Sequence, residues 1–160
     1  FHDMIQYTAA ALDICAIIGC MYFQYQQHKH HVILSKLRNK NNAKPKSNYS
    51  IPAGGWFKYI SCPHYLAEIM IYLMFAILLM NDIDNMAAGE DEVRAWLHPK
   101  GLDTCIISMI VAMYRWKYWL LLSWVISNLS ISANRTHSWY LDNYGEVYPN
   151  QRRRLIPFVW

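Results

Sequence analysis

Two titratable side chains lie near the end of the longest apolar region of the chain, where they could transfer protons or hydrogen-bond a ligand. His137 and Tyr140 are three residues apart, and Asn134 precedes His137 by three residues. This spacing places all three on one face of a helix. The same face continues backwards as a stripe of serines, which we expect to join helices: Ser123, Ser127 and Ser130,. The sequence thus predicts a polar site at Asn134, His137 and Tyr140.

A second candidate pair opens another apolar region. His64 and Glu68 are four residues apart, so they share a helix face,. A carboxylate one turn inside an apolar segment is costly to bury, which indicates a functional group. The alternative is a Glu68 at the membrane interface, solvated and inert.

A cluster of histidines, His28-Lys29-His30-His31, raises the question of a metal centre. Membrane metal centres of this kind draw on several His clusters that converge, whereas the other histidines of this chain stand singly. We therefore expect no metal, and we read the cluster as a helix end in the cytosol. No G-x-G-x-x-G motif follows a strand, so a Rossmann nucleotide site is not supported either.

The composition is that of a membrane protein. The chain of 160 residues is 54% hydrophobic and 16% charged, against about 25% charged in soluble domains. Its apolar regions predict an all-α, multi-span integral membrane helical bundle with spans at about residues 4–24, 64–80 and 114–133. Asp13, within the first span, either pairs inside the bundle or lies closer to the surface.

The charges predict an orientation. Residues 29–58 carry seven basic side chains and no acid, whereas residues 81–92 hold five acids. Because basic loops stay in the cytosol, we expect a cytosolic loop at 25–60 and a cytosolic tail at 141–160, which contains Arg152-Arg153-Arg154. Nucleic acid is not an expected partner.

Three motifs carry a resemblance to a known family. They are Ile51-Pro52-Ala53-Gly54-Gly55-Trp56-Phe57-Lys58-Tyr59, Ser61-Cys62-Pro63-His64-Tyr65-Leu66-Ala67-Glu68, and Thr136-His137-Ser138-Trp139-Tyr140 with the basic tail behind it. In the first of them, Pro52 and Gly54-Gly55 predict a tight turn. In order, spacing and membrane context they resemble the steroid 5α-reductase family, and within it the polyprenol reductases of dolichol synthesis. The chain begins at Phe1 beside an apolar segment, so we expect it to be the C-terminal half of such a protein.

The resemblance implies an NADPH pocket in this half of the protein. The positions that match the polar residues of that pocket are His31, Arg38, His64, Glu68, His137 and Tyr140. We add Asn134, which belongs to the polar stripe. His137 and Tyr140 are also the candidate catalytic residues of this chain. The family's principal catalytic Tyr and Glu are expected on N-terminal spans that this chain lacks. His64 departs from the pattern, since relatives often carry Asn there.

The resemblance also implies a reaction. NADPH would reduce the α-isoprene double bond of a polyprenyl lipid towards dolichol, which serves protein N-glycosylation, in the endoplasmic reticulum membrane. Because hydride adds poorly to an unpolarised alkene, we expect the species reduced to be the conjugated aldehyde. The expected partners are the polyprenyl substrate, membrane lipids and the missing N-terminal spans.

Other hypotheses about the function remain open. The scaffold could act on a 3-oxo-Δ4 steroid, it could be an isoprenylcysteine-type methyltransferase of related fold, or it could be a truncated, non-catalytic membrane protein. Residues 81–113 depart from the family pattern and are expected to be an insertion.

Overall fold

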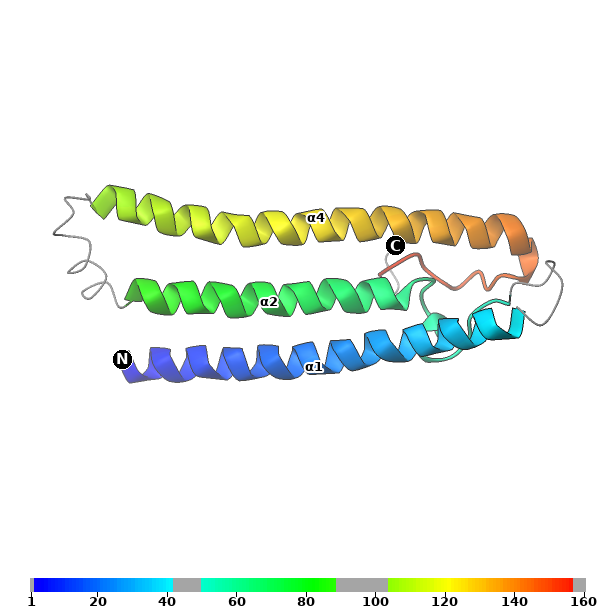
Figure 1. Cartoon of the computed structure of the whole chain (residues 1–160), viewed down its shortest axis with the longest axis horizontal. Coiled ribbons are helices and arrows are strands. Elements are labelled where there is room, and N and C mark those ends of the chain that lie inside the picture. The colour runs from blue at the N-terminus through cyan, green and yellow to red at the C-terminus, as the bar shows by residue number, and fades with distance from the viewer. Residues whose placement is uncertain (1, 42–49, 89–103, 157–160) are drawn as a thin grey trace. The chain divides into compact units, whose positions relative to one another are not determined.

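The described residues fold into three long helices, in agreement with the predicted all-α class. The computed structural model describes residues 2–41, 50–88 and 104–156. Figure 1 shows α1 (His2–Asn41), α2 (Pro63–Ala88) and α4 (Thr104–Tyr144). Two short 3-10 helices, η1 (Gly55–Lys58) and η3 (Gly145–Val147), lie in the connections.

Helix α1 is longer than predicted. The expected span ended near residue 24 and a loop was expected from residue 25, whereas the helix continues to Asn41. Residues 25–41 contain no Gly or Pro, the residues that most readily end a helix,. The predicted loop is therefore wrong for 25–41, and the histidine cluster lies inside the helix. The polar stretch 42–49 lies outside the described residues.

Helices α2 and α4 also extend beyond their predicted spans. Helix α2 reaches Ala88 and α4 begins at Thr104, so both enter the segment 81–113 that was expected to be an insertion. Residues 89–103 lie outside the described part of the chain, and the insertion stays a prediction. The tail expected from residue 141 begins as helix, because α4 continues to Tyr144.

Two helical segments are long and apolar enough to cross a membrane: Tyr7–Arg38 and Pro63–Asn81. The third predicted span, 114–133, lies within α4 but is not among the segments that meet this criterion in the described residues. Serine, tyrosine, tryptophan and basic residues in that stretch lower its mean hydropathy. Its crossing, and the predicted orientation of loop and tail, stay predictions.

The chain forms two compact units, of which the first comprises Phe1–Cys20 and Tyr72–Trp124. Its polar centre is Asn81, whose Nδ2 donates to Oδ1 of Asp13 at 2.8 Å and to the carbonyl of Ala9 at 2.9 Å. Of the two alternatives for Asp13, pairing inside the protein is therefore the correct one. Asn81 thus supplies one hydrogen bond to a half-buried carboxylate, which reduces the cost of its burial,.

The second unit comprises Met21–Ile71 and Val125–Trp160. Its part of α4 buries a stripe at helical spacing: Val125, Leu129, Ala133, His137 and Tyr140,. Ser123 and Ser127 are exposed, and the interhelical role predicted for the serines stays a prediction. His137 and Tyr140, by contrast, belong to the packed face.

The turn before η1 has the predicted glycine chemistry. Gly54 and Gly55 have φ angles of 100° and 54°, a region that side chains with a Cβ rarely adopt. A Cβ on Gly55 would stand 3.2 Å from Nε2 of His30. The turn at Pro52 and Gly54-Gly55 is thus confirmed, and it sets η1 closely against α1.

Candidate functional site

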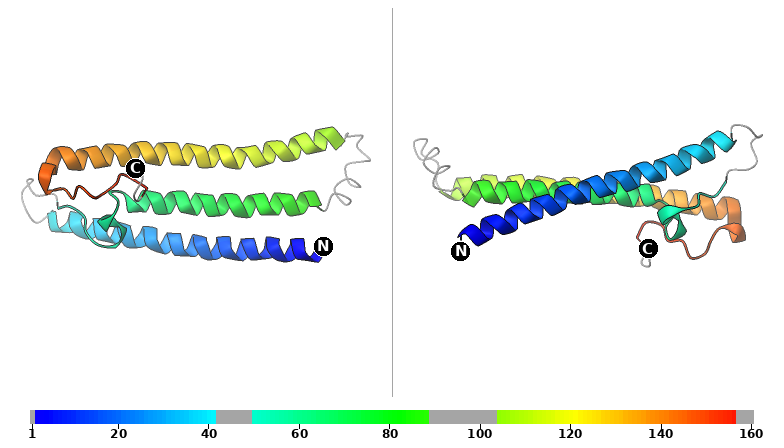
Figure 2. Two further views of the ribbon diagram at one scale, coloured as in Figure 1. Left: turned by 180° about the vertical axis from the view of Figure 1, so that it is seen from behind. Right: turned by 90° about the horizontal axis from the view of Figure 1, so that it is seen from below.

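The C-terminal tail pairs with the chain that leads into α2 (Figures 1 and 2). Ile60 and Arg153 form an isolated parallel bridge. The amide of Ser61 donates to the carbonyl of Arg153 at 2.8 Å, and the amide of Arg153 donates to the carbonyl of Tyr59 at 2.9 Å. Leu155, buried in a core cluster with Cys62 and Ala133, then anchors the tail. Residues distant in the sequence meet there beside the end of α4.

Ser61 is the polar centre of this meeting point. Its Oγ lies 2.6 Å from Nδ1 of His137, 2.6 Å from the hydroxyl of Tyr148 and 3.1 Å from the carbonyl of Arg153. Ser61 is 2% exposed, and so water does not compete for these contacts. One hydroxyl therefore joins the start of α2, the end of α4 and the tail.

Aromatic rings surround that hydroxyl. The ring of Tyr148 stacks on Tyr140 with centroids 5.3 Å apart and 12° between the planes, and it meets His137 edge to face at 5.7 Å. The guanidinium carbon of Arg152 lies 5.4 Å from the Tyr148 ring centroid, a cation–π distance. The rings fix the positions of the polar atoms at their edges.

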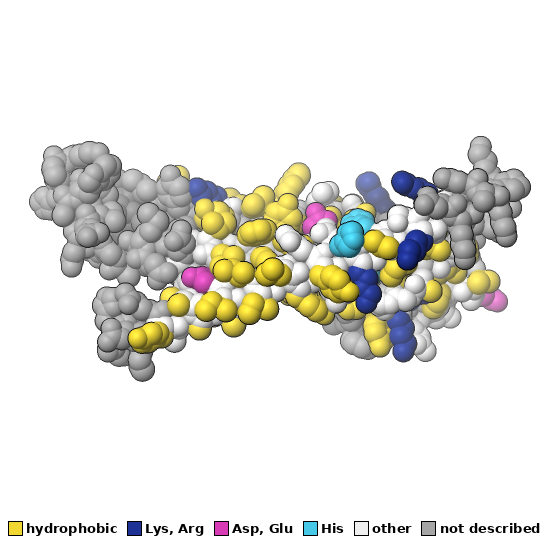
Figure 3. Space-filling view, turned by 60° about the horizontal axis from the view of Figure 1, so that its bottom comes forward, with side chains coloured by type: hydrophobic (Ala, Val, Ile, Leu, Met, Phe, Trp, Pro, Cys, Tyr) yellow, Lys and Arg dark blue, Asp and Glu magenta, His cyan; other side chains and the backbone are white. Residues whose placement is uncertain are grey.

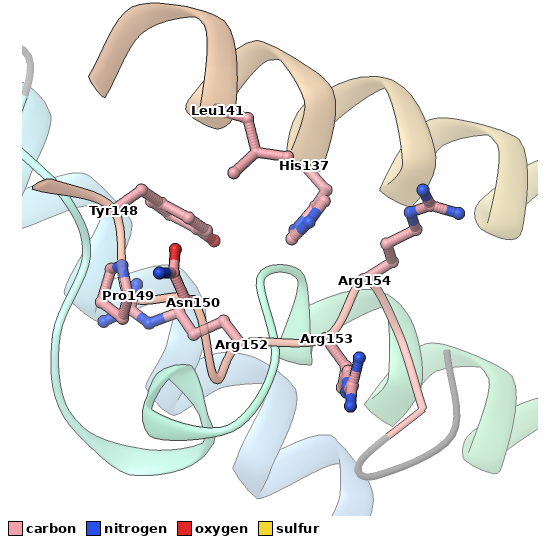
Figure 4. A pocket seen from close by; sticks show the side chains of 8 residues that line it. All are labelled: His137, Leu141, Tyr148, Pro149, Asn150, Arg152, Arg153 and Arg154. Atoms are coloured by element: carbon pink, nitrogen blue, oxygen red, sulfur yellow. The ribbon is translucent and has the colours of Figure 1, made fainter. Parts of the chain in front are cut away.

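A pocket of about 360 Å³ opens beside this cluster, a volume within the range of small-molecule sites, ~300–1,000 Å³. Figure 4 shows the side chains that line it: His137, Leu141, Tyr148, Pro149, Asn150, Arg152, Arg153 and Arg154. Three consecutive arginines among these residues carry donors of the kind that bind anionic oxygens.

Arg152 carries the most specific signal in the pocket. The side chain is only 8% exposed, and its Nε and Nη1 are buried without a hydrogen-bond partner among the described residues. A buried guanidinium is costly unless its N–H groups are paired. These atoms therefore fit a ligand with anionic oxygens, such as a phosphate group.

His137 is held neutral. Burial, and secondly the positive charge of Arg154, lower the pKa of its imidazole below the usual value,. The nearby thiol of Cys62 is protonated as well, since burial raises its pKa to about 12, against a smaller opposing effect of its hydrogen bond with Thr136. The positive charge at this site at neutral pH thus comes from the arginines.

A second polar cluster lies between α1 and α2 in the same unit. Nε2 of Gln27 donates to Oε2 of Glu68 at 3.4 Å, and the rings of His31 and His64 lie 5.3 Å apart. The space-filling view shows histidine side chains on this face with acidic and basic side chains near them (Figure 3). Glu68 is thus half-buried and hydrogen-bonded, and its functional role stays a prediction.

His30 has a structural place. It is fully buried, and its Nε2 accepts the backbone N–H of Trp56 at 3.4 Å, so it supports the turn before η1. The histidine cluster is therefore divided, because His31, the next residue, is exposed. Within the part of the chain that the structure describes, no three His, Cys, Asp or Glu side chains are grouped as metal ligands.

The structure separates the predicted cofactor residues into two clusters. His137 and Tyr140 belong to the arginine-lined cluster, whereas His31, His64 and Glu68 belong to the second. Ser61 and His64, three residues apart, link the two along the chain. Asn134 is half-buried one turn before His137, and Arg38 is exposed near the end of α1; no contact joins either residue to these clusters among the described residues.

Sequence reasoning missed three members of the site: Ser61, Tyr148 and Arg152. The arginines were noticed only as a sign of orientation, and Tyr148 lies in the tail that was treated as a loop. Ser61 stands directly before Cys62-Pro63 in one of the quoted motifs, which is the one signal that could have drawn attention to it.

Comparison with known proteins gives consistent relatives. The sequence is 35% identical to polyprenal reductase 1 of Oryza sativa subsp. indica over 89% of this chain and 31% of the relative. It is 35% identical to polyprenal reductase 1 of Arabidopsis thaliana over 84% of this chain and 31% of the relative. It is 30% identical to human polyprenal reductase over 90% of this chain and 36% of the relative. The chain thus spans about a third of the length of these relatives.

The family assignment rests on a match that covers most of the chain. Residues 2–87 and 104–160 match the family described as 3-oxo-5-alpha-steroid 4-dehydrogenase. The matched residues include all three quoted motifs, both polar clusters and the arginine-lined pocket. The chain therefore belongs to the 3-oxo-5-alpha-steroid 4-dehydrogenase family, the steroid 5α-reductases that its motifs resemble.

Proposed function

We propose that this chain is the cofactor-binding part of an NADPH-dependent polyprenal reductase. The observation that carries the proposal is the buried guanidinium of Arg152, a residue that lines the pocket and whose Nε and Nη1 have no hydrogen-bond partner among the described residues. Together with Arg153 and Arg154 it offers the donors that a dinucleotide's phosphate groups require.

The two clusters suit different parts of an extended dinucleotide. The arginine-lined pocket fits its anionic end, and the second cluster of Gln27, His31, His64 and Glu68 offers neutral and acidic hydrogen-bonding groups for its remaining polar groups. Ser61 and His64 lie within one turn of each other in sequence, which allows one ligand to reach both clusters. Arg38 and Asn134 remain candidates that no contact supports.

The cofactor, when bound, would supply hydride for the saturation of a carbon–carbon double bond. The residues of this chain would bind it, orient it and keep water from its phosphates. The relatives are named polyprenal reductases, which agrees with the expectation that a conjugated aldehyde is the species reduced. A carbonyl accepts the developing negative charge on oxygen, where hydrogen-bond donors stabilise it.

The substrate, a polyprenyl aldehyde on the route to dolichol in the endoplasmic reticulum membrane, belongs to the same proposal. The same proposal includes a cytosolic tail and N-terminal spans, which complete the enzyme with its principal catalytic Tyr and Glu. Tyr140, stacked on Tyr148, and His137 are the groups of this chain nearest to that chemistry. A 3-oxo-Δ4 steroid is the alternative substrate, favoured by the family match.

The test is nucleotide binding by this chain in nanodiscs. NADPH, NADH and S-adenosylmethionine are titrated separately, and the expected result is saturable binding of NADPH with clearly weaker binding of NADH. Preference for S-adenosylmethionine would favour the methyltransferase reading. A folded chain that binds none of the three would contradict a cofactor site built by these residues.

A further inference from the structure

We propose that Ser61 is a positioning residue: it holds His137 as the Nδ1–H tautomer, so that Nε2 presents a lone pair to a hydroxyl or amide N–H of the pocket's ligand. The identity of that ligand rests on the proposed function. The tautomer rests on the contacts of Ser61 alone.

The first step is a count of protons around the Ser61 hydroxyl. A serine hydroxyl has one proton to donate and two lone pairs with which to accept. Three polar atoms lie around it: Nδ1 of His137 at 2.6 Å, the hydroxyl of Tyr148 at 2.6 Å and the carbonyl oxygen of Arg153 at 3.1 Å. A carbonyl oxygen accepts and never donates. All three contacts are attractive in one arrangement only, in which Ser61 donates to Arg153 and accepts from the other two.

This arrangement assigns every proton. The Tyr148 hydroxyl donates to Ser61, and Nδ1 of His137 must carry a proton and donate as well. If Ser61 instead donated to His137, its lone pairs would face those of the Arg153 carbonyl at 3.1 Å. That contact would then be repulsive in a site that water does not reach, where unpaired polar atoms are most costly.

The second step concerns the other ring nitrogen. Neutral imidazole has one N–H and one lone pair, so a proton on Nδ1 leaves Nε2 as an acceptor. His137 is neutral at pH 7, since burial and Arg154 lower its pKa. Among the described residues its hydrogen-bond partner is Ser61, through Nδ1. Nε2 is therefore left for the contents of the pocket, which His137 lines (Figure 4).

The third step assigns roles within the pocket. A phosphate at neutral pH has no proton to give to Nε2, so phosphate groups belong to the arginines. Nε2 suits a ribose hydroxyl or a carboxamide N–H instead. In this state His137 has no proton on the nitrogen that faces the ligand. It therefore acts as a ligand acceptor, and a proton donor for the reduction has to come from another group.

The experiment reads the tautomer directly. Histidine is labelled with ¹⁵N in the whole chain in nanodiscs, and the His137 signals are identified by their loss in His137→Gln, or by their broadening beside a spin label on exposed Asn143 if that variant does not fold. The expected spectrum at pH 7.5 has a pyrrole-type Nδ1 and a pyridine-type Nε2. A protonated Nε2 with a bare Nδ1 would overturn the proposal.

Two variants separate positioning from mere structure. Ser61→Ala should lose the Nδ1–H bias and weaken NADPH binding about tenfold, as expected for the loss of one buried hydrogen bond. Ser61→Thr keeps the hydroxyl and should restore the tautomer. Tyr148→Phe should leave the tautomer unchanged, because Ser61 still donates to Arg153. A Ser61→Ala spectrum identical to that of the wild type would refute the positioning role.

The readouts distinguish this inference from the proposed function. An Nδ1–H tautomer in a chain that binds no NADPH would support the role of Ser61 and contradict the cofactor. NADPH binding by a chain whose His137 is the Nε2–H tautomer would support the cofactor and contradict the role of Ser61.

Discussion

Replacement of Arg152 by methionine should weaken NADPH binding without destabilising the folded chain. The side chain is 8% exposed, and Nε and Nη1 have no partner among the described residues. A lone buried charge costs about several kcal/mol of desolvation, and its cation–π contact with Tyr148 returns about 0.5–2 kcal/mol. Methionine has a similar length and no charge, so the thermal unfolding midpoint should stay the same or rise.

Binding should respond in the opposite direction. A hydrogen bond from a charged donor contributes about 1.5–3 kcal/mol, so the Kd for NADPH should rise roughly ten- to a hundredfold. The assay is fluorescence titration of NADPH against the chain in nanodiscs, with thermal unfolding of the same samples. Arg135→Met is the matched control, since Arg135 is exposed on α4 and does not line the pocket. It removes the same charge and should change the Kd less than about threefold.

Two results would refute this reasoning. If Arg152→Met binds NADPH as tightly as the wild type, the unpaired guanidinium does not serve the cofactor. If the Arg152→Met chain instead unfolds at a much lower temperature than the Arg135→Met chain, Arg152 is a structural residue that the fold requires.

Three further predictions concern His137, Cys62 and Gly55. In ¹⁵N NMR, the pKa of His137 should lie below the ordinary histidine range. Arg154→Gln should raise this pKa only in part, because burial is the larger cause of the shift. A full return to the ordinary value would show that Arg154 and not burial is the larger cause. Cys62 should resist N-ethylmaleimide at pH 7.5 in the folded chain and react only after denaturation, because its pKa is raised to about 12,. Peptide mapping locates the label, and labelled Cys62 in the folded chain would contradict this prediction. Gly55→Ala should lower the unfolding midpoint more than Gly145→Ala: both have positive φ, which costs about 1 kcal/mol with a Cβ, but only at Gly55 would the Cβ meet a histidine ring nitrogen at 3.2 Å. Equal effects would show that this contact does not matter.

The sequence predicted those features that follow from local pattern. Long apolar regions and the scarcity of charged residues predicted the all-α class, and the glycines at 54 and 55 predicted the turn. The spacing of His137 and Tyr140 correctly placed both on one packed face. Local pattern failed at helix ends: the basic charges after residue 28 led us to assign 25–60 to a cytosolic loop, but residues 25–41 contain no Gly or Pro and the helix continues to Asn41,.

The site itself depended on contacts that spacing cannot show. Ser61 and Arg153 are 92 residues apart and meet only because the tail turns back at η3 and pairs with the chain before α2. A serine before Cys62-Pro63 has nothing unusual in its sequence context, and a run of arginines after a span is equally typical of a cytosolic end. The tertiary pairing alone turns these ordinary residues into one cluster.

The most direct test of the account is whether NADPH reaches Arg152. The Nε–H signal of this arginine can be followed by ¹H–¹⁵N NMR of the chain in nanodiscs and identified by its loss in Arg152→Met. We expect a saturable shift of that signal as NADPH is added, because the buried N–H gains an anionic partner. Saturable NADPH binding that leaves the Arg152 signal where it was would place the cofactor elsewhere and contradict the account.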